Sequence, residues 1–292
     1  MRTPLPYYGA KVSMAKRIVR ELPEKHEVYL EPFCGSAAVF FEKPPAEAVE
    51  ILSDMNPWCL AALRAVRDTP WSFHDALPDE IEHDHWRNSV IAVRNNRITG
   101  SDIEDGVNMF LAWQSAFNSG PWSGARSKRA CQQYADSRGK GLVWQRIEAG
   151  FERLNAGSGT LVEQTDAISG IRREAAPGVL IFCDPPYMKM EEGGGSRGAA
   201  YGGYGPWEPD MLWHQEFLDA IDEADRAGAM IAMTTGRDGI YEERLAAADF
   251  VLTGSMGMGR GAGRGGHAPG MGGAAKAEHC IWVNQALLEA RL

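Results

Sequence analysis

The chain has 292 residues, enough for one large domain or for a core domain carrying an inserted second one. Its composition, 44% hydrophobic and 24% charged, is that of an ordinary globular protein. With no apolar run near the roughly 20 residues that span a bilayer and no apolar signal core at the N-terminus, we expect a cytosolic protein; the net charge of -9 disfavours an extended basic surface for nucleic acid.

Short apolar runs of the kind that form buried strands recur along the chain, with helical spacing between several of them. Helical faces are expected around Ala15–Leu22 and Met211–Ile221. Strands and helices in alternation predict an α/β fold with a mostly parallel sheet. The predicted strands are Val28–Leu30, Val49–Leu52, Thr160–Val162, Val179–Phe182, Met230–Met233, Phe250–Leu252 and Cys280–Val283.

One region, residues 57–157, breaks this alternation, because it has helical spacing and no convincing buried strand. Trp144, Ile147, Phe151 and Leu154 keep a helical period. About 100 residues is too long for a simple crossover between strands. We therefore expect an inserted helical domain at 57–157, and a catalytic domain built from residues 1–56 and 158–292.

The predicted insert also contains the most basic part of the chain. Between Pro121 and Arg153 there are seven Lys and Arg residues against three acidic ones, a local charge of +4. An acidic protein with one basic segment fits a focused contact with nucleic acid, and a solvated charged face is the competing interpretation.

Two glycine-rich stretches, Glu192–Gly205 and Met256–Gly273, are expected to form mobile loops. The five cysteines are widely spread without a Cys-x-x-Cys pair, so we expect them to be reduced, buried and not part of a zinc site. His83-Asp84-His85 lacks a third ligand at useful spacing and predicts an exposed polar loop.

The segment Asp184-Pro185-Pro186-Tyr187 directly follows the predicted strand Val179–Phe182. Ligands of open α/β sheets bind beyond the carboxyl ends of the strands. There the Asp184 carboxylate and the Pro185 carbonyl can each accept a hydrogen bond from an amino group, and Tyr187 offers a face for a planar base. This suits an exocyclic amine, whose lone pair is delocalised into its ring until two acceptors on its hydrogens favour a pyramidal nitrogen.

Upstream, the run from Val28 to Phe40 predicts a strand, a turn with small residues around Gly35, and an apolar helix. The free N–H groups of such a turn and helix start suit a bound ligand. Asp54, at the tip of the next strand, is placed to hold ribose hydroxyls. The G-x-G-x-x-G fingerprint is absent, which disfavours a nicotinamide or flavin cofactor.

These motifs together resemble those of the Dam-type adenine-N6 DNA methyltransferases of bacteria and phages, in the order of the α group. Tyr7-Tyr8-Gly9-Ala10-Lys11 resembles the family's F-x-G-G-K motif, and Glu31–Ala37 resembles E-P-F-x-G-S-G, with Ala10 and Ala37 in place of glycines. Both changes cost little if φ is negative at these positions. Ser53–Asn56 resembles the ribose-binding acidic motif, and Thr165-Asp166-Ala167 lies where the family binds the cofactor adenine.

The resemblance implies a Rossmann-like doubly wound sheet with an inserted helical target-recognition domain, and S-adenosylmethionine as the cofactor, leaving S-adenosylhomocysteine. It also implies methylation of a flipped-out adenine in double-stranded DNA, without metal, in the cytoplasm of a bacterial host and in a restriction-modification or phage context. We expect a monomer, with a dimer as the alternative. The recognition segment Phe110–Gly120 diverges most, so the target sequence is not predicted.

The residues implied at the site fall into three groups. The catalytic residues are Asp184, Pro185, Pro186 and Tyr187. The cofactor-binding residues are Tyr7, Tyr8, Gly9, Lys11, Glu31, Pro32, Phe33, Cys34, Gly35, Ser36, Asp54, Met55, Asn56, Asp166, Ala167 and Asp184. The DNA-binding residues are Asn118, Trp122, Arg126, Lys128, Arg129, Arg138 and Lys140.

Two alternative functions remain at this point. Cytosine-N4 methyltransferases use a similar turn, usually with Ser first, so Asp184 speaks against them. A non-catalytic DNA-binding relative is disfavoured by the intact tetrapeptide. Structured RNA is a lesser possibility as the substrate, because the tetrapeptide reads only the amine.

Overall fold

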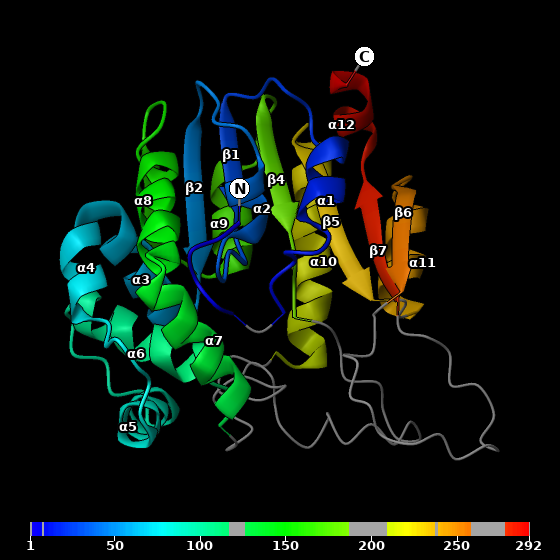
Figure 1. Ribbon diagram of the computed structural model, residues 1–292. Coiled ribbons are helices and arrows are strands. Elements are labelled where there is room, and N and C mark those ends of the chain that lie inside the picture. Colours follow the sequence, from blue (N-terminus) through cyan, green and yellow to red (C-terminus); the bar gives the residue numbers. More distant parts are fainter. Residues whose placement is uncertain are drawn as a thin grey trace.

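A computed structural model describes residues 2–7, 9–116, 126–186, 209–236, 239–257 and 278–291. Over these residues the chain forms a seven-stranded sheet (Figure 1). The strands are β1 (Val28–Glu31), β2 (Val49–Asp54), β3 (Thr160–Gln164), β4 (Val179–Cys183), β5 (Met230–Gly236), β6 (Val251–Gly257) and β7 (Glu278–Val283). Each contains or overlaps one of the seven predicted apolar runs, so the strand predictions are confirmed.

The order of strands in the sheet is β3-β2-β1-β4-β5-β7-β6. The first five strands pair in parallel, whereas β7 is antiparallel to both β5 and β6. The chain thus starts in the middle of the sheet and winds outward in both directions, so β1 and β4 are neighbours at the switch point, where ligands bind in such folds. The predicted doubly wound α/β fold is confirmed.

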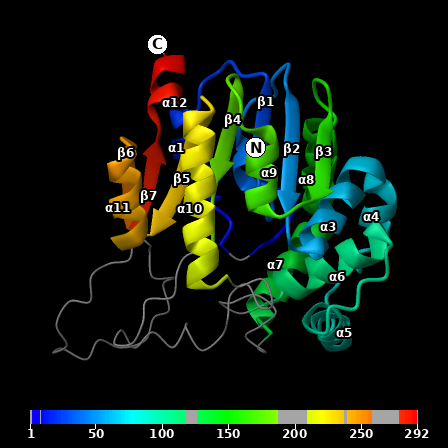
Figure 2. The same cartoon turned by 180° about the vertical axis from the view of Figure 1, so that it is seen from behind.

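Helices cover both faces of the sheet, because alternate residues of each strand project to opposite sides. One face packs against α1 (Ala15–Glu21), α2 (Ala38–Glu42), α3 (Pro57–Asp68) and α12 (Gln285–Ala290). The other face, turned to the viewer in Figure 2, packs against α9 (Ala167–Glu174), α10 (Met211–Arg226) and α11 (Gly239–Ala247). Leu180 and Phe182 of β4 belong to the first core, and Ile181 and Cys183 to the second.

Six helices lie between β2 and β3 in the described residues of the 57–157 segment. Besides α3 they are α4 (Pro70–Ala76), α5 (His83–Arg94), α6 (Asp102–Gln114), α7 (Lys128–Gly139) and α8 (Leu142–Leu154). Helices α5, α6 and α7 extend past the carboxyl ends of the strands (Figure 1). The core of this segment is continuous with one face of the sheet, because Trp58 and Leu63 of α3 and Phe110 of α6 share a cluster with Leu52 and Phe182. The domain boundaries themselves remain a prediction.

A buried ionic cluster joins the last insert helix to the sheet. Glu50 of β2 accepts two hydrogen bonds from Arg153 of α8, at 2.7 and 2.8 Å, and one from Lys43 at 2.7 Å. Burial alone would raise the pKa of Glu50, but the bonds from Arg153 and Lys43 hold it below its ordinary value. Removing one partner of such a buried group costs roughly 3–5 kcal/mol. Arg153, which was counted in the basic segment, is therefore buried in an ion pair and not exposed on the surface.

All five cysteines are buried and free, as predicted. His83, Asp84 and His85 begin helix α5 rather than forming a loop, and the His85 ring accepts a hydrogen bond from the Glu82 amide at 3.4 Å. The first glycine-rich stretch lies outside the described residues. The second begins within β6, and its remainder also lies outside them. In the parts of the chain described, no helix combines the length and the apolar character needed to cross a bilayer.

Candidate active site

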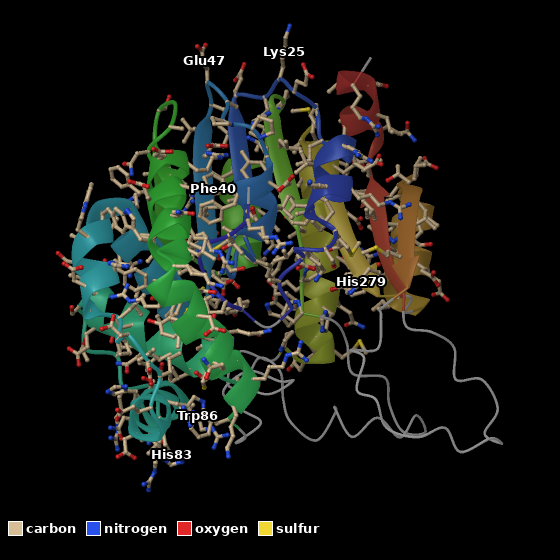
Figure 3. All side chains as sticks on the ribbon, viewed as in Figure 1. Lys25, Phe40, Glu47, His83, Trp86 and His279 are labelled. Atoms are coloured by element: carbon tan, nitrogen blue, oxygen red, sulfur yellow. The ribbon has the colours of Figure 1, made fainter. Side chains whose placement is uncertain are left out.

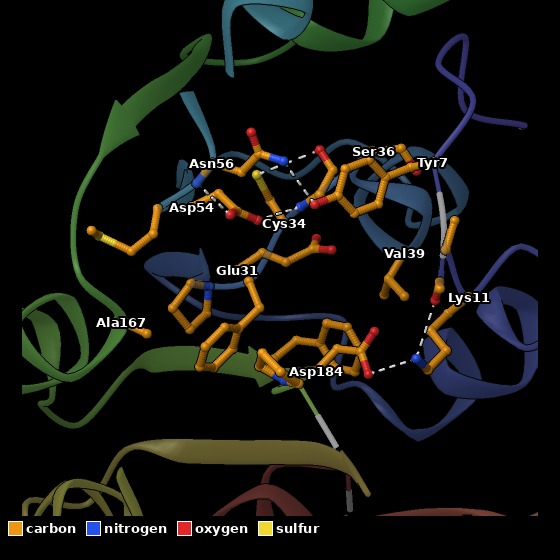
Figure 4. Close-up of a pocket in the computed structure, with 18 of the residues that line it drawn as sticks. Tyr7, Lys11, Glu31, Cys34, Ser36, Val39, Asp54, Asn56, Ala167 and Asp184 are labelled. Carbon is orange, nitrogen blue, oxygen red and sulfur yellow. Dashed lines mark hydrogen bonds and ion pairs between the residues drawn. The ribbon is translucent and has the colours of Figure 1, made fainter. Parts of the chain in front are cut away.

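A cavity of about 340 Å³ opens at the carboxyl ends of β1, β2 and β4 (Figure 4). Lys25 and Glu47, which precede β1 and β2, lie at the amino ends of these strands (Figure 3). His279 lies toward the opposite end of the sheet, where the cavity opens (Figure 3). The cavity is lined by Tyr7, Gly9, Ala10, Lys11, Glu31, Pro32, Phe33, Cys34, Gly35, Ser36, Ala38, Val39, Asp54, Met55, Asn56, Asp166, Ala167, Phe182, Asp184, Pro186, Pro209 and Trp213.

The turn between β1 and α2 uses left-handed backbone at two positions. Gly35 has φ +47°, and a Cβ on it would lie 2.8 Å from the Tyr7 ring. Ala37 has φ 53° and ψ 39°, a conformation that costs a non-glycine residue roughly 1–2 kcal/mol. The expectation that alanine at position 37 is harmless if φ is negative therefore does not hold there. Ala10 is not among the described residues with positive φ.

Asp54, at the end of β2, is held by backbone amides. Its carboxylate accepts hydrogen bonds from the N–H of Gly35 at 2.8 Å and of Asn56 at 2.9 Å. Burial raises the pKa of Asp54 to about 6, against the opposing effect of these bonds. The Asn56 side chain in turn accepts from the Trp58 amide at the start of α3 and donates to the Tyr7 hydroxyl at 3.1 Å.

Tyr7 links this loop to the helical insert. Its ring stacks on Trp113 of α6, with the ring centroids 5.6 Å apart and 13° between the planes. Trp113 is itself buried. Tyr7 therefore contacts both the loop after β2, through Asn56, and helix α6, through Trp113.

Glu31 places a second, more deeply buried carboxyl at the floor of the cavity. It is 3% exposed and accepts hydrogen bonds from the Tyr29 hydroxyl at 2.9 Å and the Phe40 amide at 3.2 Å, both on Oε2. Burial raises the pKa of Glu31 to about 8. The carboxyl therefore keeps its proton at neutral pH, which makes it a potential donor as well as an acceptor.

Asp184, directly after β4, is held by side chains from two distant segments. Its Oδ1 lies 2.7 Å from the Lys11 ammonium and accepts a hydrogen bond from the Thr234 hydroxyl of β5 at 2.6 Å. Lys11 is buried and also donates to the Gly9 carbonyl at 3.2 Å. The carboxylate of Asp184 is thus fixed at the end of β4, on the wall of the cavity.

Aromatic and helix-capping residues complete the walls. Phe33 packs edge-on against Trp213 and Phe217 of α10, and the latter two rings are stacked with 3° between their planes. Asp166 caps α9 by accepting from the Ser169 amide at 2.9 Å. Ser36 is buried at the cavity, and its hydroxyl has no hydrogen-bond partner among the described residues, so a polar ligand atom there would satisfy it.

Every predicted cofactor-binding residue that the structure describes lines this one cavity. Tyr8, predicted to bind the cofactor, and Tyr187, predicted to be catalytic, lie outside the described residues. Sequence reasoning did not assign Ala38, Val39, Phe182, Pro209 or Trp213 to the cavity, nor Thr234 to Asp184. Phe182 lies within a predicted strand, Thr234 directly follows the predicted strand Met230–Met233, and Trp213 lies within a predicted helix. An apolar or β-branched residue at such a position carries no signal of a site.

The predicted DNA-binding residues divide into two kinds. Lys128, Arg129 and Lys140 are exposed on and after α7. Arg126 and Arg138 instead bond to backbone carbonyls, Arg126 to Ile81 and Arg138 to Leu77. Two guanidinium groups of the basic segment thus help to hold the α4–α5 connection. Asn118 and Trp122 lie outside the described residues.

One group of potential metal donors borders the cavity in the part of the chain described: Cys34, Asp54 and Cys59, with donor atoms within 4.8 Å of one another. Burial raises the pKa of both thiols, and metals bind the thiolate. Asp54 is already engaged with two backbone amides. The donor set as it stands does not favour a metal site.

The fold and the cavity together define a class of protein. A doubly wound sheet with an acid after its second strand and an Asp-Pro-Pro turn at the switch point fits a nucleoside-cofactor transferase whose acceptor meets Asp184. The sequence comparison then gives a more specific similarity. The family model of the D12 class N6 adenine-specific DNA methyltransferases matches residues 7–95. This match confirms the resemblance predicted from the motifs and, with it, the predicted adenine-N6 DNA methyltransferase function and S-adenosylmethionine cofactor.

Three known proteins illustrate the similarity. The Type II methyltransferase M1.LlaDCHI of Lactococcus lactis subsp. cremoris is 23% identical over 240 residues, which are 80% of this chain and 81% of the relative. Among solved structures, the rRNA methyltransferase aviRa from Streptomyces viridochromogenes has 16% identity and a TM-score of 0.38, covering 99% of this chain and 90% of its own. SMU.472, a putative methyltransferase complexed with SAH, has 10% identity and a TM-score of 0.35, and the match covers 94% of this chain and 52% of SMU.472.

Proposed function

We propose that the chain transfers a methyl group from S-adenosylmethionine to the N6 atom of adenine in double-stranded DNA, with Asp184 as the acceptor for the amine. The observation that carries this proposal is the position of Asp184. Its carboxylate lies at the switch point, is paired with Lys11, and borders the same cavity as Asp54. A cofactor held by Asp54 and an amine held by Asp184 would thus meet across one cavity.

The residues present fit the proposed cofactor. Asp54 offers carboxylate oxygens where ribose hydroxyls need acceptors, and Ser36 offers a hydroxyl that has no partner in the described part of the chain. Phe33, Trp213 and Ala167 provide the apolar surface that a planar adenine needs, with Asp166 at its rim. When bound, S-adenosylmethionine supplies an electrophilic methyl group on its sulfonium.

The protein's part in the reaction is to bind and orient the amine. Asp184 and the Pro185 carbonyl each accept a hydrogen bond from the N6 amino group. These two bonds favour a pyramidal nitrogen whose lone pair points along the axis of transfer. As the bond from N6 to the methyl carbon forms, the bond from sulfur to that carbon breaks, and N6 then releases one proton. The negative charge of Asp184 stabilises the positive charge that develops on N6. This preorganised interaction and the positioning of the amine would together supply most of the rate enhancement.

The target base would have to leave the duplex to reach Asp184. We propose residues 57–157 as the recognition domain that presents it, because α5, α6 and α7 extend beyond the same edge of the sheet as the cavity (Figure 1). Lys128, Arg129 and Lys140 would contact phosphates there. Stacking of the flipped base on Tyr187, and contacts from Asn118 and Trp122, remain predictions from the family resemblance.

We further propose that the enzyme works as a monomer in the cytoplasm of a bacterial host. A role in restriction-modification is supported by the Type II designation of the Lactococcus relative. We make no proposal for the recognition sequence, because the insert diverges most from the family's motifs.

The proposed function is tested by incubating the protein with isotopically labelled S-adenosylmethionine and DNA of varied sequence, alongside Asp184→Ala. We expect the wild-type protein to label DNA, and Asp184→Ala to lose transfer by about 10³-fold or more while cofactor binding stays measurable by titration. An unlabelled DNA product with the wild-type protein, or equal transfer by the variant, would contradict the proposal.

A further inference from the structure

The catalytic carboxylate has two oxygens, and its two bonds to other side chains in the described structure fall on the same one. The Lys11 ammonium and the Thr234 hydroxyl both contact Oδ1 of Asp184, at 2.7 and 2.6 Å. A carboxylate oxygen offers about two lone-pair positions, so Oδ1 is filled by these donors. Within the described residues, the acceptor capacity that remains for an amine is therefore on Oδ2.

The two donors differ in stiffness. Lys11 belongs to the N-terminal segment and reaches Asp184 with a long side chain of several rotatable bonds. Thr234 is fully buried on β5, and its β-branched side chain has few rotamers. Its backbone is fixed on both sides, because β5 pairs with β4 through Cys183 and Met233 and with β7 through Thr234 and Ile281.

From this geometry we infer that Thr234 is a positioning residue for methyl transfer: its hydroxyl fixes the plane of the Asp184 carboxylate so that Oδ2 faces the target amine. This inference rests on the proposed function. Lys11 supplies the positive charge that pairs with Asp184, and Thr234 sets the orientation of the carboxylate plane. A carboxylate held by Lys11 alone keeps its charge but can turn about its own axis, and small misplacements of a reacting group cost up to about 10² in rate.

The neighbouring residue offers a matched control. Thr235 is also a buried threonine of β5, and its hydroxyl accepts a hydrogen bond from the Trp282 indole at 3.2 Å, on the opposite face of the sheet. Thr235→Val loses one buried hydrogen bond, as Thr234→Val does, but does not touch Asp184. The two variants therefore separate a loss of stability from a loss of positioning.

The experiment compares the wild-type protein with Thr234→Val, Thr234→Ser and Thr235→Val, measuring kcat, the KM for each substrate and the melting temperature. We expect Thr234→Val to lower kcat about 10- to 100-fold with both KM values within about threefold. Thr234→Ser keeps the hydroxyl and should recover most of the rate. Thr235→Val should lower the melting temperature but leave kcat within about threefold.

Two outcomes would overturn the inference: wild-type kcat in a folded Thr234→Val, or an equal loss of kcat in Thr235→Val. If Thr234→Val does not fold, Thr234→Ser and Thr234→Ala replace it, and equal rates in that pair would overturn the inference. A wild-type protein that methylates no adenine contradicts the proposed function, whereas an active wild type with an equally active Thr234→Val contradicts only the role of Thr234.

Discussion

The two aspartates that border the cavity, Asp54 after β2 and Asp184 after β4, are held in different ways. The Asp54 carboxylate accepts hydrogen bonds from two backbone amides in adjacent loops, so its position depends on how the main chain folds. Asp184 is held by the side chains of Lys11 and Thr234, which come from segments far apart in the sequence. Backbone anchoring survives most substitutions nearby, whereas side-chain anchoring fails when a single partner changes. The cofactor side of the site should therefore tolerate mutation better than the catalytic side.

The strongest challenge to this contrast is to remove the cation from Asp184. Lys11→Met keeps the length of the side chain but leaves Oδ1 with Thr234 alone and an unpaired charge. We expect single-turnover methyl transfer to fall about 10²-fold or more, with the dissociation constant of the cofactor within about fivefold. Lys16→Met, on the exposed face of α1, is the control and should behave like the wild type. A fall in affinity that accounts for the whole loss of rate would place Lys11 on the cofactor side instead.

A second test uses the buried carboxyl between the two aspartates. Because the folded-state pKa of Glu31 is raised from 4.5 to about 8, its contribution to stability is fully present below pH 4.5 and is lost as pH rises through 8. We expect wild-type unfolding free energy to fall by about 2–3 kcal/mol between pH 6 and pH 9 from this group, and the fall to be absent in Glu31→Gln. Urea unfolding at both pH values measures this, with the exposed Glu47→Gln as control. Parallel losses in the wild type and Glu31→Gln would mean that Glu31 is already ionised at pH 6.

A third test concerns Asp54. Asp54→Asn puts an amide donor against a backbone N–H, so we expect cofactor affinity to weaken about 10- to 30-fold, or roughly 1.5–2 kcal/mol. The rate at saturating cofactor should change far less. In the wild type, affinity should also fall as pH drops through about 6, where Asp54 takes up its proton, and this dependence should vanish in the variant. Calorimetric titration between pH 5 and pH 8 measures both; a pH-independent wild type would contradict the assignment.

The smallest effect tests the loop that anchors Asp54. Ala37→Gly relieves the left-handed strain, so we expect about 1 kcal/mol of added stability, less the loss of one buried methyl group. Ala38 is the next residue and lies in the helical conformation. Ala38→Gly should therefore destabilise the protein by about 0.5–1 kcal/mol. Thermal unfolding of the two variants measures the difference, and a destabilised Ala37→Gly would show that the methyl contact outweighs the strain.

Much of the fold was predictable from the sequence, because buried parallel strands are continuous apolar runs and their periodicity is local. The insert was predictable as helical for the same reason. The grouping of the proposed cofactor-binding residues was predictable because they sit in contiguous motifs, such as Glu31–Ser36 and Asp54–Asn56. All of these fall on one cavity.

What could not be predicted is the part of the site that depends on contacts between distant segments. Thr234 is one more β-branched residue in an apolar strand until β5 is paired beside β4. Arg153 of α8 turns inward to Glu50 of β2, a contact between distant segments, so the count of basic residues overstates the charge exposed on this segment. The positive φ of Ala37 is likewise invisible in a sequence that carries alanine there.

The central claim is that the cavity between Asp54 and Asp184 methylates the N6 atom of adenine in DNA. The most direct measurement is to methylate DNA with labelled S-adenosylmethionine, digest it to nucleosides and identify the labelled nucleoside by chromatography and mass. The account predicts label in N6-methyladenine alone. Label in N4-methylcytosine, or in no nucleoside, would contradict it.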